Sequence, residues 1–596
     1  MSAPIASASN SSALIWGVAE LLRGDYKQAD YGRVILPFTL LRRLDCVLAP
    51  TKDAVLAAAP QAQRVSESVR FDILTEQSGY QFYNTSKFDI ARLLGDPEHL
   101  KANLLAYVRD FSPSARDIFE HYDFEKTIET LAKANLLYQV LEKFKTIDLS
   151  PKAVSNADMG LAFEELIRRF AELSNETAGE HFTPREVIRL MVNLLFAPDA
   201  DALSAKGVIR SLYDPTAGSG GMLTVGEEHL HAMNPHATLN IFGQELNDES
   251  YAICKADMLI KGHDVRHIIC GNTLSDDGHR DRRFDYMLSN PPFGVDWKKV
   301  EKAVRDESEQ LGHGGRFGPG LPRTSDGSLL FLLHLLSKMR PARDGGSRIG
   351  IVLNGSPLFT GDAGSGESEI RRHILENDLL ETLVALPTDM FYNTGIATYV
   401  WILCNRKRPG RAGKVLLVNA ADMGVKMKKS LGSKRKELST EAVDEITRLA
   451  EAFSDKDDRC RIVPTETFGY WSLTVERPLL DDKGRPVKDR KGRIKADSAK
   501  RDSETVPFTR VPKFTAKGEE RPHPAVRADL EKYLADEVLP HAPDAYIDHD
   551  KTRVGYEIPF NRFFYRYTPP RPLADIDRDL RASVDRIQKL LAEITR

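Results

Sequence analysis

Between about residues 205 and 405, short apolar runs alternate with stretches of helical periodicity, and this alternation restricts the fold more than any other feature. A helix such as LLFLLHLLSKM fits between two of the runs. The pattern predicts an α/β domain with a mostly parallel sheet. The expected strands are GVIRSLYD (207–214), LNIFGQE (239–245), VRHIICG (265–271), FDYMLSNPPF (284–293), SRIGIVLN (347–354), LLETLVALP (379–387) and IATYVWILCN (396–405).

The regions on either side have a different character. Residues 10 to about 150 have helical spacing, which predicts an α-helical N-terminal domain over 1–153, and the α/β domain is then expected over 154–470. The remaining region, 471–596, holds a basic, exposed insertion at 476–502; a second basic run lies at 426–436. The last segment is expected to be a helix that docks on a partner or folds back on its own domain, because its apolar residues form one stripe: Ile576, Leu580, Val584, Ile587, Leu591 and Ile594.

Composition narrows the class of protein. Hydrophobic residues make up 41% and charged residues 28% of the 596 residues, as in ordinary globular proteins, and the net charge of −3 excludes a uniformly basic nucleic-acid coat. Five widely spaced cysteines without a CxxC pair argue against a disulfide scaffold and a cysteine zinc site. We find neither a signal peptide nor a membrane-spanning run, so a cytoplasmic location is expected.

A glycine-rich turn, Asp214-Pro-Thr-Ala-Gly-Ser-Gly-Gly221, follows the first expected strand and precedes a helix. Glycine lets the backbone approach a ligand closely, and the helix N-terminus offers unpaired N–H groups. Leu223 breaks the GxGxxG fingerprint, and GxxxxGK[ST] does not occur in the chain. The turn by itself is compatible with a purely structural role.

An acidic residue, Glu245, closes the next expected strand about one βαβ unit later. A carboxylate in that position can accept hydrogen bonds from both hydroxyls of a ribose. A solvated loop carboxylate is the alternative interpretation.

The segment Ser289-Asn290-Pro291-Pro292-Phe293 is the most specific signal in the chain. Two prolines cannot continue a central strand, so the chain leaves the sheet there. The Asn290 amide and the adjacent carbonyls form a rigid set of acceptors, and Phe293 supplies a flat apolar face. This combination suits a planar amino group that is hydrogen-bonded while its ring stacks.

The order DPTAGSGG, then NPPF, resembles the S-adenosylmethionine-dependent methyltransferases that methylate adenine N6 in DNA. Gly179–Arg185 (GEHFTPR) is similar to a segment of the modification (M, HsdM-type) subunits of type I restriction-modification systems. LRGDYKQADYGRVILPFTLLRRLD and TSDGSLLFLLHLL also resemble that family. The resemblance covers about residues 12–470. It implies a Rossmann-like methyltransferase domain, an α-helical N-terminal domain and a C-terminal helical extension.

The resemblance also implies roles for individual residues. S-adenosylmethionine would be held at its methionine end by 180–185 and the glycine-rich turn, at its ribose by Glu245 and at its adenine by Asn272. Asn290 and Pro291 would accept hydrogen bonds from the target N6 amino group, and Phe293 would stack on the base. The implied cofactor-binding set is Glu180, His181, Phe182, Thr183, Pro184, Arg185, Asp214, Thr216, Ala217, Gly218, Gly220, Glu245 and Asn272, and the catalytic set is Asn290, Pro291, Pro292 and Phe293.

The implied reaction is direct transfer of the methyl group from S-adenosylmethionine to a flipped-out adenine, without a metal. The implied partners are double-stranded DNA, a specificity (S) subunit, a second M subunit and a restriction (R) subunit. Three alternatives stay open. They are a self-sufficient adenine methyltransferase with target recognition in 470–596, an RNA or protein N-methyltransferase, and a non-catalytic assembly protein. The glycine-rich stretch 302–327 is interpreted as a lid, a DNA-contacting loop or a linker.

Overall fold

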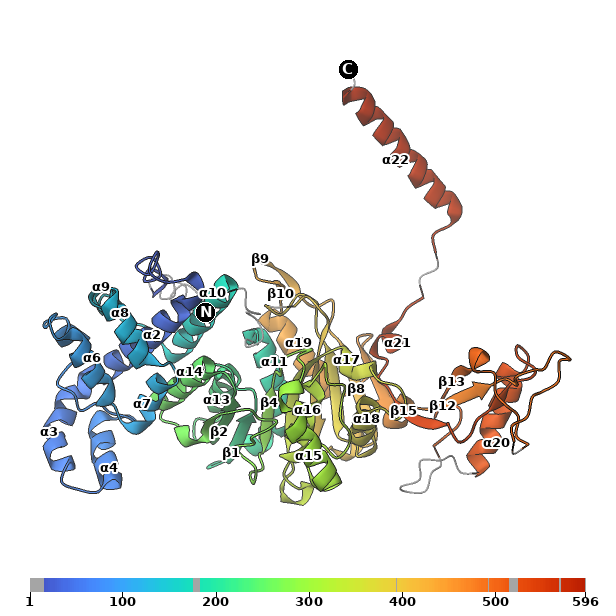
Figure 1. Ribbon diagram of the computed structural model, residues 1–596, viewed down its shortest axis with the longest axis horizontal. Helices are drawn as coiled ribbons and strands as arrows, with labels where there is room; N and C mark the ends of the chain where they lie inside the picture. Colours follow the sequence, from blue (N-terminus) through green and yellow to red (C-terminus); the bar gives the residue numbers. More distant parts are fainter. Residues whose placement is uncertain are drawn as a thin grey trace. The chain divides into compact units, whose positions relative to one another are not determined.

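The computed structural model describes residues 15–174, 183–392, 394–490, 492–513, 524–567 and 570–594 (Figure 1). Within these residues the largest sheet has nine strands, in the order β11-β8-β6-β7-β5-β4-β1-β2-β3. All seven expected strands are present in it, which confirms the α/β interpretation. Their bounds are β1 Ile209–Asp214, β2 Thr238–Glu245, β3 Ile268–Cys270, β4 Tyr286–Ser289, β5 Arg348–Asn354, β6 Leu380–Ala385 and β7 Thr398–Cys404; β8 is Lys414–Asn419 and β11 is Cys460–Pro464.

The strand directions create a switch point in the sheet. Strands β3, β2, β1, β4 and β5 are parallel, whereas β7 is antiparallel to both β5 and β6. From β1 the chain proceeds to β2 and β3, and it then crosses to β4 on the other side of β1. The carboxyl ends of β1 and β4 therefore flank a crevice of the kind in which open α/β sheets bind ligands.

Helices connect the strands and cover the sheet. Buried residues of α11 and α19, such as Leu195 and Ile446, share one apolar cluster with Val400 and Ile402 of β7. The leucine-rich helix α16 contacts β5. The helices of this region are α11 Arg185–Phe196, α12 Ala200–Leu203, α13 Gly221–Met233, α14 Asp248–Ile260, α15 Glu301–Leu311, α16 Ser328–Ser337, α17 Ser356–Phe359, α18 Gly366–Glu376 and α19 Thr440–Ala452.

The N-terminal region is helical, as expected, and packs on the α/β region. Lys255 Nζ of α14 lies 2.5 Å from Asp117 Oδ2, and His121 Nδ1 lies 2.7 Å from Asp248 Oδ1. One expected helical stretch is different, because residues 17–22 form successive turns. The helices are α2 Tyr31–Leu48, α3 Lys52–Ala62, α4 Glu67–Ser78, α5 Ile90–Leu93, α6 Leu100–Arg109, α7 Pro113–Glu120, α8 Phe124–Lys133, α9 Leu137–Lys145 and α10 Asn156–Ser174.

The stretch 302–327 is not a continuous loop, because its first part is helical. Residues Glu301–Leu311 form α15. Most of this segment consists of residues with good helix propensity, and Glu301 and Arg305 form an i,i+4 ion pair with a 2.8 Å N–O distance. The glycines that suggested a loop begin only at Gly312.

Beyond the main sheet, the described part of the chain forms two smaller sheets. The basic run 426–436 lies in a hairpin of β9 Val425–Leu431 and β10 Lys434–Glu437. A four-stranded sheet that the sequence did not predict contains β12 Gly469–Glu476, β13 Asp502–Pro507, β14 Tyr546–Ile547 and β15 Arg553–Tyr556. The charged insertion between β12 and β13 is mostly exposed, as expected. Helix α20 spans Pro524–Tyr533.

Residues Pro559–Arg596 form a separate compact unit. It contains α21 Phe560–Phe564 and α22 Leu573–Ile594, so the expected terminal helix is present. Its apolar stripe is exposed, with 57% exposure of Leu580, 50% of Val584 and 57% of Ile587. In the part of the chain that the structure describes, no helix has the length and apolarity needed to cross a membrane. The boundaries at 153 and 470 stay predictions.

Candidate active site

A cavity of about 210 Å³ lies at the carboxyl ends of β1, β2, β3 and β4. Nine of the expected site residues line it: Thr183, Asp214, Thr216, Ala217, Gly218, Glu245, Asn272, Asn290 and Pro292. Residues far apart in the sequence thus meet at one edge of the sheet, as the parallel arrangement requires. Further lining residues are Glu164, Ile188, Pro215, Ser219, Gly221, Met222, Leu246, Thr273, Val295 and Phe331.

The glycine-rich turn takes a backbone shape that requires glycine. Gly218 and Gly220 have φ of 54° and 85°, in the left-handed region that other residues adopt at a cost. A Cβ on Gly220 would also lie 3.0 Å from Cys254 Sγ. Helix α13 begins directly afterwards at Gly221, and its first two residues, Gly221 and Met222, line the cavity.

Glu245 is nearly buried and is held by backbone amides at both carboxylate oxygens. The Gly218 N–H donates to Oε2 at 2.7 Å, and the Asn247 N–H donates to Oε1 at 2.8 Å. The carboxylate therefore fixes the glycine-rich turn of β1 to the end of β2. Since each carboxylate oxygen has a second lone pair, it can still accept a ligand hydroxyl.

Asp214 is the buried acid at the end of β1. Burial raises the pKa of its carboxyl to about 7, although hydrogen bonds from the Thr216 N–H (2.9 Å) and hydroxyl (3.1 Å) to Oδ1 lower it. Thr216 Oγ1 also lies 2.9 Å from Ser289 Oγ, which links the turn to the end of β4. A positively charged ligand in the cavity would favour the ionised form of Asp214.

Asn290 lies at the end of β4 with a defined amide orientation. Its Nδ2 donates to Thr183 Oγ1 at 2.9 Å. Its Oδ1 is buried and, among the described residues, has no hydrogen-bond partner. A buried amide oxygen without a donor costs free energy, roughly 1–3 kcal/mol, so this atom marks where a ligand N–H or O–H belongs.

The remaining residues of the NPPF segment surround this oxygen. Pro291 is buried, and Pro292 lines the cavity. Phe293 lies outside the cavity lining and packs edge-on against Phe391, with the ring centroids 5.7 Å apart. Phe293 is only partly buried, so part of its ring is accessible for a stacking contact.

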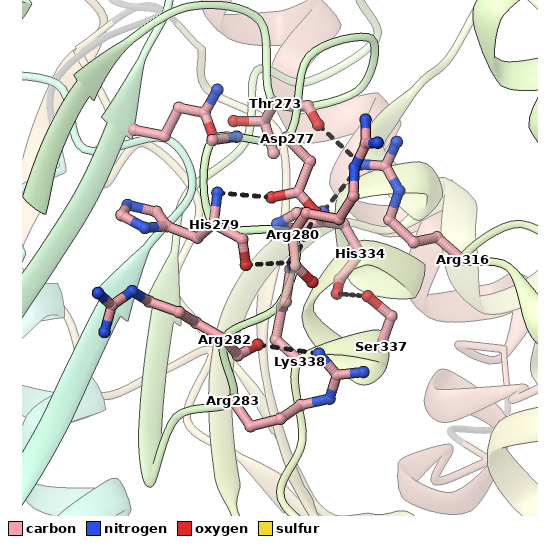
Figure 2. Close-up of polar contacts among 12 residues, drawn as sticks. Thr273, Asp277, His279, Arg280, Arg282, Arg283, Arg316, His334, Ser337 and Lys338 are labelled. Carbon is pink, nitrogen blue, oxygen red and sulfur yellow. Dashed lines mark hydrogen bonds and ion pairs between the residues drawn. The ribbon is translucent and has the colours of Figure 1, made fainter.

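The loop after β3 is braced by an arginine from the stretch that follows α15. Arg316 donates to the carbonyl oxygens of Thr273 (2.8 Å) and Leu274 (2.9 Å) and pairs with Glu307. Its Nη1 lies 3.1 Å from His334 Nδ1 (Figure 2). Asn272 Oδ1 accepts from the Leu274 N–H, so the side chain expected at the cofactor adenine also caps this turn.

A lysine anchors the next part of the same loop. Lys338 Nζ lies 2.5 Å from Asp277 Oδ2 and donates to the His279 carbonyl oxygen at 2.8 Å (Figure 2). Both charged side chains are almost fully buried, at 2% and 4% exposure. The segment 272–280 is therefore held on two sides, which fixes one wall of the cavity.

The other expected residues are either outside the described part of the chain or outside the cavity lining. Glu180, His181 and Phe182 fall outside the described residues. Pro184 is buried at the start of α11, and Arg185 points to Glu164, with 3.7 Å between Nη2 and Oε1. Gly220, Pro291, Pro184, Arg185 and Phe293 are not among the cavity-lining residues.

Glu164 of α10 is a lining residue that sequence reasoning missed. Burial raises the pKa of its carboxyl, although the charge of Arg185 opposes this effect. Which side of α10 faces the cavity depends on helix packing, and the segment FEELIRRF carries no motif that shows it.

Comparisons with known proteins identify the family of the chain. The family profile described as N-6 DNA Methylase matches residues 154–475, and the HsdM N-terminal domain matches residues 12–144. The chain is 24% identical to the type I restriction enzyme MjaIX methylase subunit of Methanocaldococcus jannaschii, over 75% of this chain and 78% of that protein. It is 27% identical to the HindI methylase subunit of Haemophilus influenzae, over 49% and 59% respectively.

A solved structure shows the same fold. The methyltransferase subunit of a type I restriction-modification system from Streptococcus thermophilus superposes with a TM-score of 0.60 at 24% identity, over 77% of this chain and 97% of that one. The two family matches together span the helical N-terminal region and the main sheet. The chain therefore belongs to the N-6 DNA methylase family and is an HsdM-type type I methylase subunit, an adenine-specific DNA methyltransferase.

Proposed function

We propose that the chain transfers a methyl group from S-adenosylmethionine to the N6 atom of an adenine that has been flipped out of duplex DNA. The observation that carries this proposal is the buried, unpartnered Oδ1 of Asn290, fixed by Thr183 at the edge of the cavity. An exocyclic amino group can supply the donor that this oxygen lacks, and the family acts on adenine N6.

The cavity fits S-adenosylmethionine in charge and in hydrogen-bonding groups. Three carboxyl groups, of Glu164, Asp214 and Glu245, line it. They suit a ligand with a sulfonium, an ammonium group and ribose hydroxyls. Glu245 would accept from the ribose, and the turn 216–218 would lie along the methionine end. Asn272 would contact the adenine of the cofactor, which when bound supplies an electrophilic methyl group.

The residues of this chain would make N6 a better nucleophile by orientation. The N6 lone pair of adenine is delocalised into the ring. Hydrogen bonds from N6–H to Asn290 Oδ1 and to the Pro291 carbonyl oxygen would favour a more tetrahedral nitrogen, whose lone pair points into the cavity. This contribution is positioning and electrostatic preorganisation and needs no covalent enzyme intermediate.

The target base must leave the helix to reach Asn290, because the amino group is not accessible inside the duplex stack. The accessible part of the Phe293 ring would stack on the extruded adenine, and Phe391 holds that ring in place from its edge. Stacking on an aromatic ring recovers about 1–3 kcal/mol per base.

The chain would act in a complex with an S subunit that reads the DNA sequence, together with a second M subunit and, for cleavage, an R subunit. The exposed apolar stripe of α22 supports a helical docking partner, since such a stripe is typical of a coiled-coil seam. The net charge of −3 agrees with a chain that gains part of its DNA affinity from a partner.

The direct test is methyl transfer from labelled S-adenosylmethionine to duplex DNA, by the chain alone and with the product of its neighbouring S-type gene. Enzymatic digestion of the DNA would then identify the labelled nucleoside. We expect N6-methyladenine only when the S subunit is present. Methyl transfer by the chain alone would contradict the proposal that the S subunit is needed. Label on another base or on the protein would contradict the proposal that adenine is the substrate.

A further inference from the structure

The hairpin Val425–Glu437 carries a concentration of positive charge that the other described residues do not neutralise. It contains Lys426, Lys428, Lys429, Lys434, Arg435 and Lys436 and one acidic residue, Glu437. Only Lys434 is buried, and it pairs with Glu186. The other five basic side chains are exposed or half-exposed, and the described part of the chain offers none of them an ion pair.

The register of the hairpin brings like charges together. Lys436 lies directly opposite Lys426 in the antiparallel pair, and Lys428 follows Lys426 on the same face. Like charges opposite each other destabilise a strand pair, and an isolated two-stranded hairpin is only marginally stable. An arrangement of this kind becomes favourable when a polyanion supplies the missing negative charge.

The hairpin is tied to the two segments that hold the NPPF loop. Lys434 binds Glu186, which lies on the first turn of α11 shortly after Thr183, the partner of Asn290. The Arg435 and Lys436 N–H groups donate to the Asp389 carbonyl oxygen at 2.9 and 3.1 Å, close in sequence to the Phe391 ring that contacts Phe293. Figure 1 shows β9 and β10 projecting from the body beside α19 and α11.

We infer that the hairpin Val425–Glu437 binds the phosphate backbone of the duplex beside the base that is methylated. This inference rests on the proposed function for the identity of the polyanion. The face that bears Lys426, Lys428 and Lys436 makes the contact. The contact is to phosphates and carries no sequence information, so target choice stays with the partner.

The test compares two triple variants of equal charge change in the complex with the S subunit. The hairpin variant is Lys426→Gln, Lys428→Gln and Lys436→Gln. The matched control is Lys483→Gln, Lys488→Gln and Lys495→Gln, three exposed lysines of the insertion 476–502. Fluorescence anisotropy measures the Kd for a labelled duplex between about 50 and 200 mM salt, the range in which phosphate contacts dominate.

The slope of log K against log salt is negative, and each lost phosphate contact reduces its magnitude by about 0.9. For the hairpin variant we expect the magnitude of this slope to be smaller by about 2–3. Its Kd near 0.1 M salt should be at least tenfold higher than that of the wild type. The control should behave as the wild type. The melting temperature of the hairpin variant should stay equal or rise, because one repulsive pair is removed, and its affinity for S-adenosylmethionine should not change.

An unchanged salt slope in the hairpin variant, or an equal loss in the control, would overturn the inference. Loss of S-subunit assembly with an unchanged slope in the remaining complex would also overturn it and assign the hairpin to a protein partner. Failure of the proposed function can be distinguished from failure of this inference. If the wild-type complex binds duplex DNA without methylating it, the salt slope can still be measured for both variants. A wild-type complex that does not bind duplex DNA overturns the inference.

Discussion

At the scale of single residues, Thr183 fixes the orientation of the Asn290 amide before any substrate binds. Thr183 Oγ1 accepts from Nδ2, which leaves Oδ1 as the side that faces a ligand. An amide that could rotate freely would present its NH₂ group to N6–H half of the time. Both groups are then donors, so no hydrogen bond forms. The Thr183 hydroxyl therefore matters for catalysis through orientation, in addition to any contact with the cofactor.

Replacing Thr183 with valine keeps the volume and removes the acceptor. We expect the single-turnover rate of methyl transfer to fall about 10–100-fold, which corresponds to ~1.4–2.8 kcal/mol. Thr183→Ser keeps the hydroxyl and should stay within a few-fold of the wild type. A Thr183→Val variant that loses only cofactor affinity, with an unchanged rate at saturation, would show that Thr183 does not position Asn290.

The buried Asp214 predicts a pH dependence. Its pKa is raised to about 7, so below pH 7 the free protein holds a neutral carboxyl there. Binding a cationic ligand favours the ionised form, so kcat/KM for S-adenosylmethionine should fall about tenfold per pH unit below 7 and level off above it. Asp214→Asn should flatten this profile. A flat wild-type profile between pH 6 and 8 would contradict the assignment.

At the scale of elements, the site depends on loops that buried ion pairs hold in place. Arg316 binds the carbonyl oxygens of Thr273 and Leu274 and so connects the stretch after α15 to the loop after β3. The sequence did not reveal this contact, because GHGGRFGPG indicates only a flexible loop. The partner carbonyls come from a segment about forty residues earlier.

Arg316→Gln should loosen the wall of the cavity that includes Asn272. We expect the Kd for S-adenosylmethionine, measured by calorimetry, to rise at least tenfold, and the melting temperature to fall because Glu307 loses its part-buried partner. The control is Arg116→Gln, which breaks an exposed i,i+4 pair with Glu120 and should cost less than about 1 kcal/mol. Equal effects of the two substitutions would refute the bracing role.

The elements of the main sheet were largely predictable. Strands β4 to β7 are apolar runs that are buried on both faces, and helices follow β1, β2, β4 and β5, which is the pattern of an α/β sheet. The sheet of β12 to β15 was missed because segments such as Asp502–Pro507 are short and polar. Strands of that kind are stabilised by pairing with distant segments, which local periodicity does not show.

The site was predictable where a motif lies at a strand end, and unpredictable where packing alone brings a side chain in. Asp214, Glu245 and Asn290 follow parallel strands, so their meeting at one edge follows from the topology. Glu164 reaches the cavity from a helix, and Arg316 reaches its wall from a loop. Their positions depend on three-dimensional packing, for which the sequence holds no local signal.

At the scale of the whole molecule, the cavity and the exposed apolar stripe of α22 belong to different units. Residues up to Ile558 contain the cavity, and Pro559–Arg596 is a unit of its own that carries the exposed stripe of α22. A stripe of this kind is costly to leave in water. It is therefore the part of the chain most suited to bind another subunit.

Substitution of Leu580, Val584 and Ile587 by serine should abolish co-purification with the S subunit. The melting temperature of the 1–558 unit and its affinity for S-adenosylmethionine should not change, since these residues belong to the other unit. The control places serine at Arg581, Asp585 and Lys589 on the same helix. Loss of assembly in both variants would point to loss of the helix, and retained assembly in both would place docking elsewhere.

The most direct test of the account is the single-turnover rate of methyl transfer by Asn290→Ala, in the complex with the S subunit and with labelled S-adenosylmethionine bound at saturation. We predict that the variant binds the cofactor as tightly as the wild type and forms N6-methyladenine at least a thousandfold more slowly, because the substrate amino group loses the acceptor that orients it. A variant that methylates adenine within tenfold of the wild-type rate would contradict it.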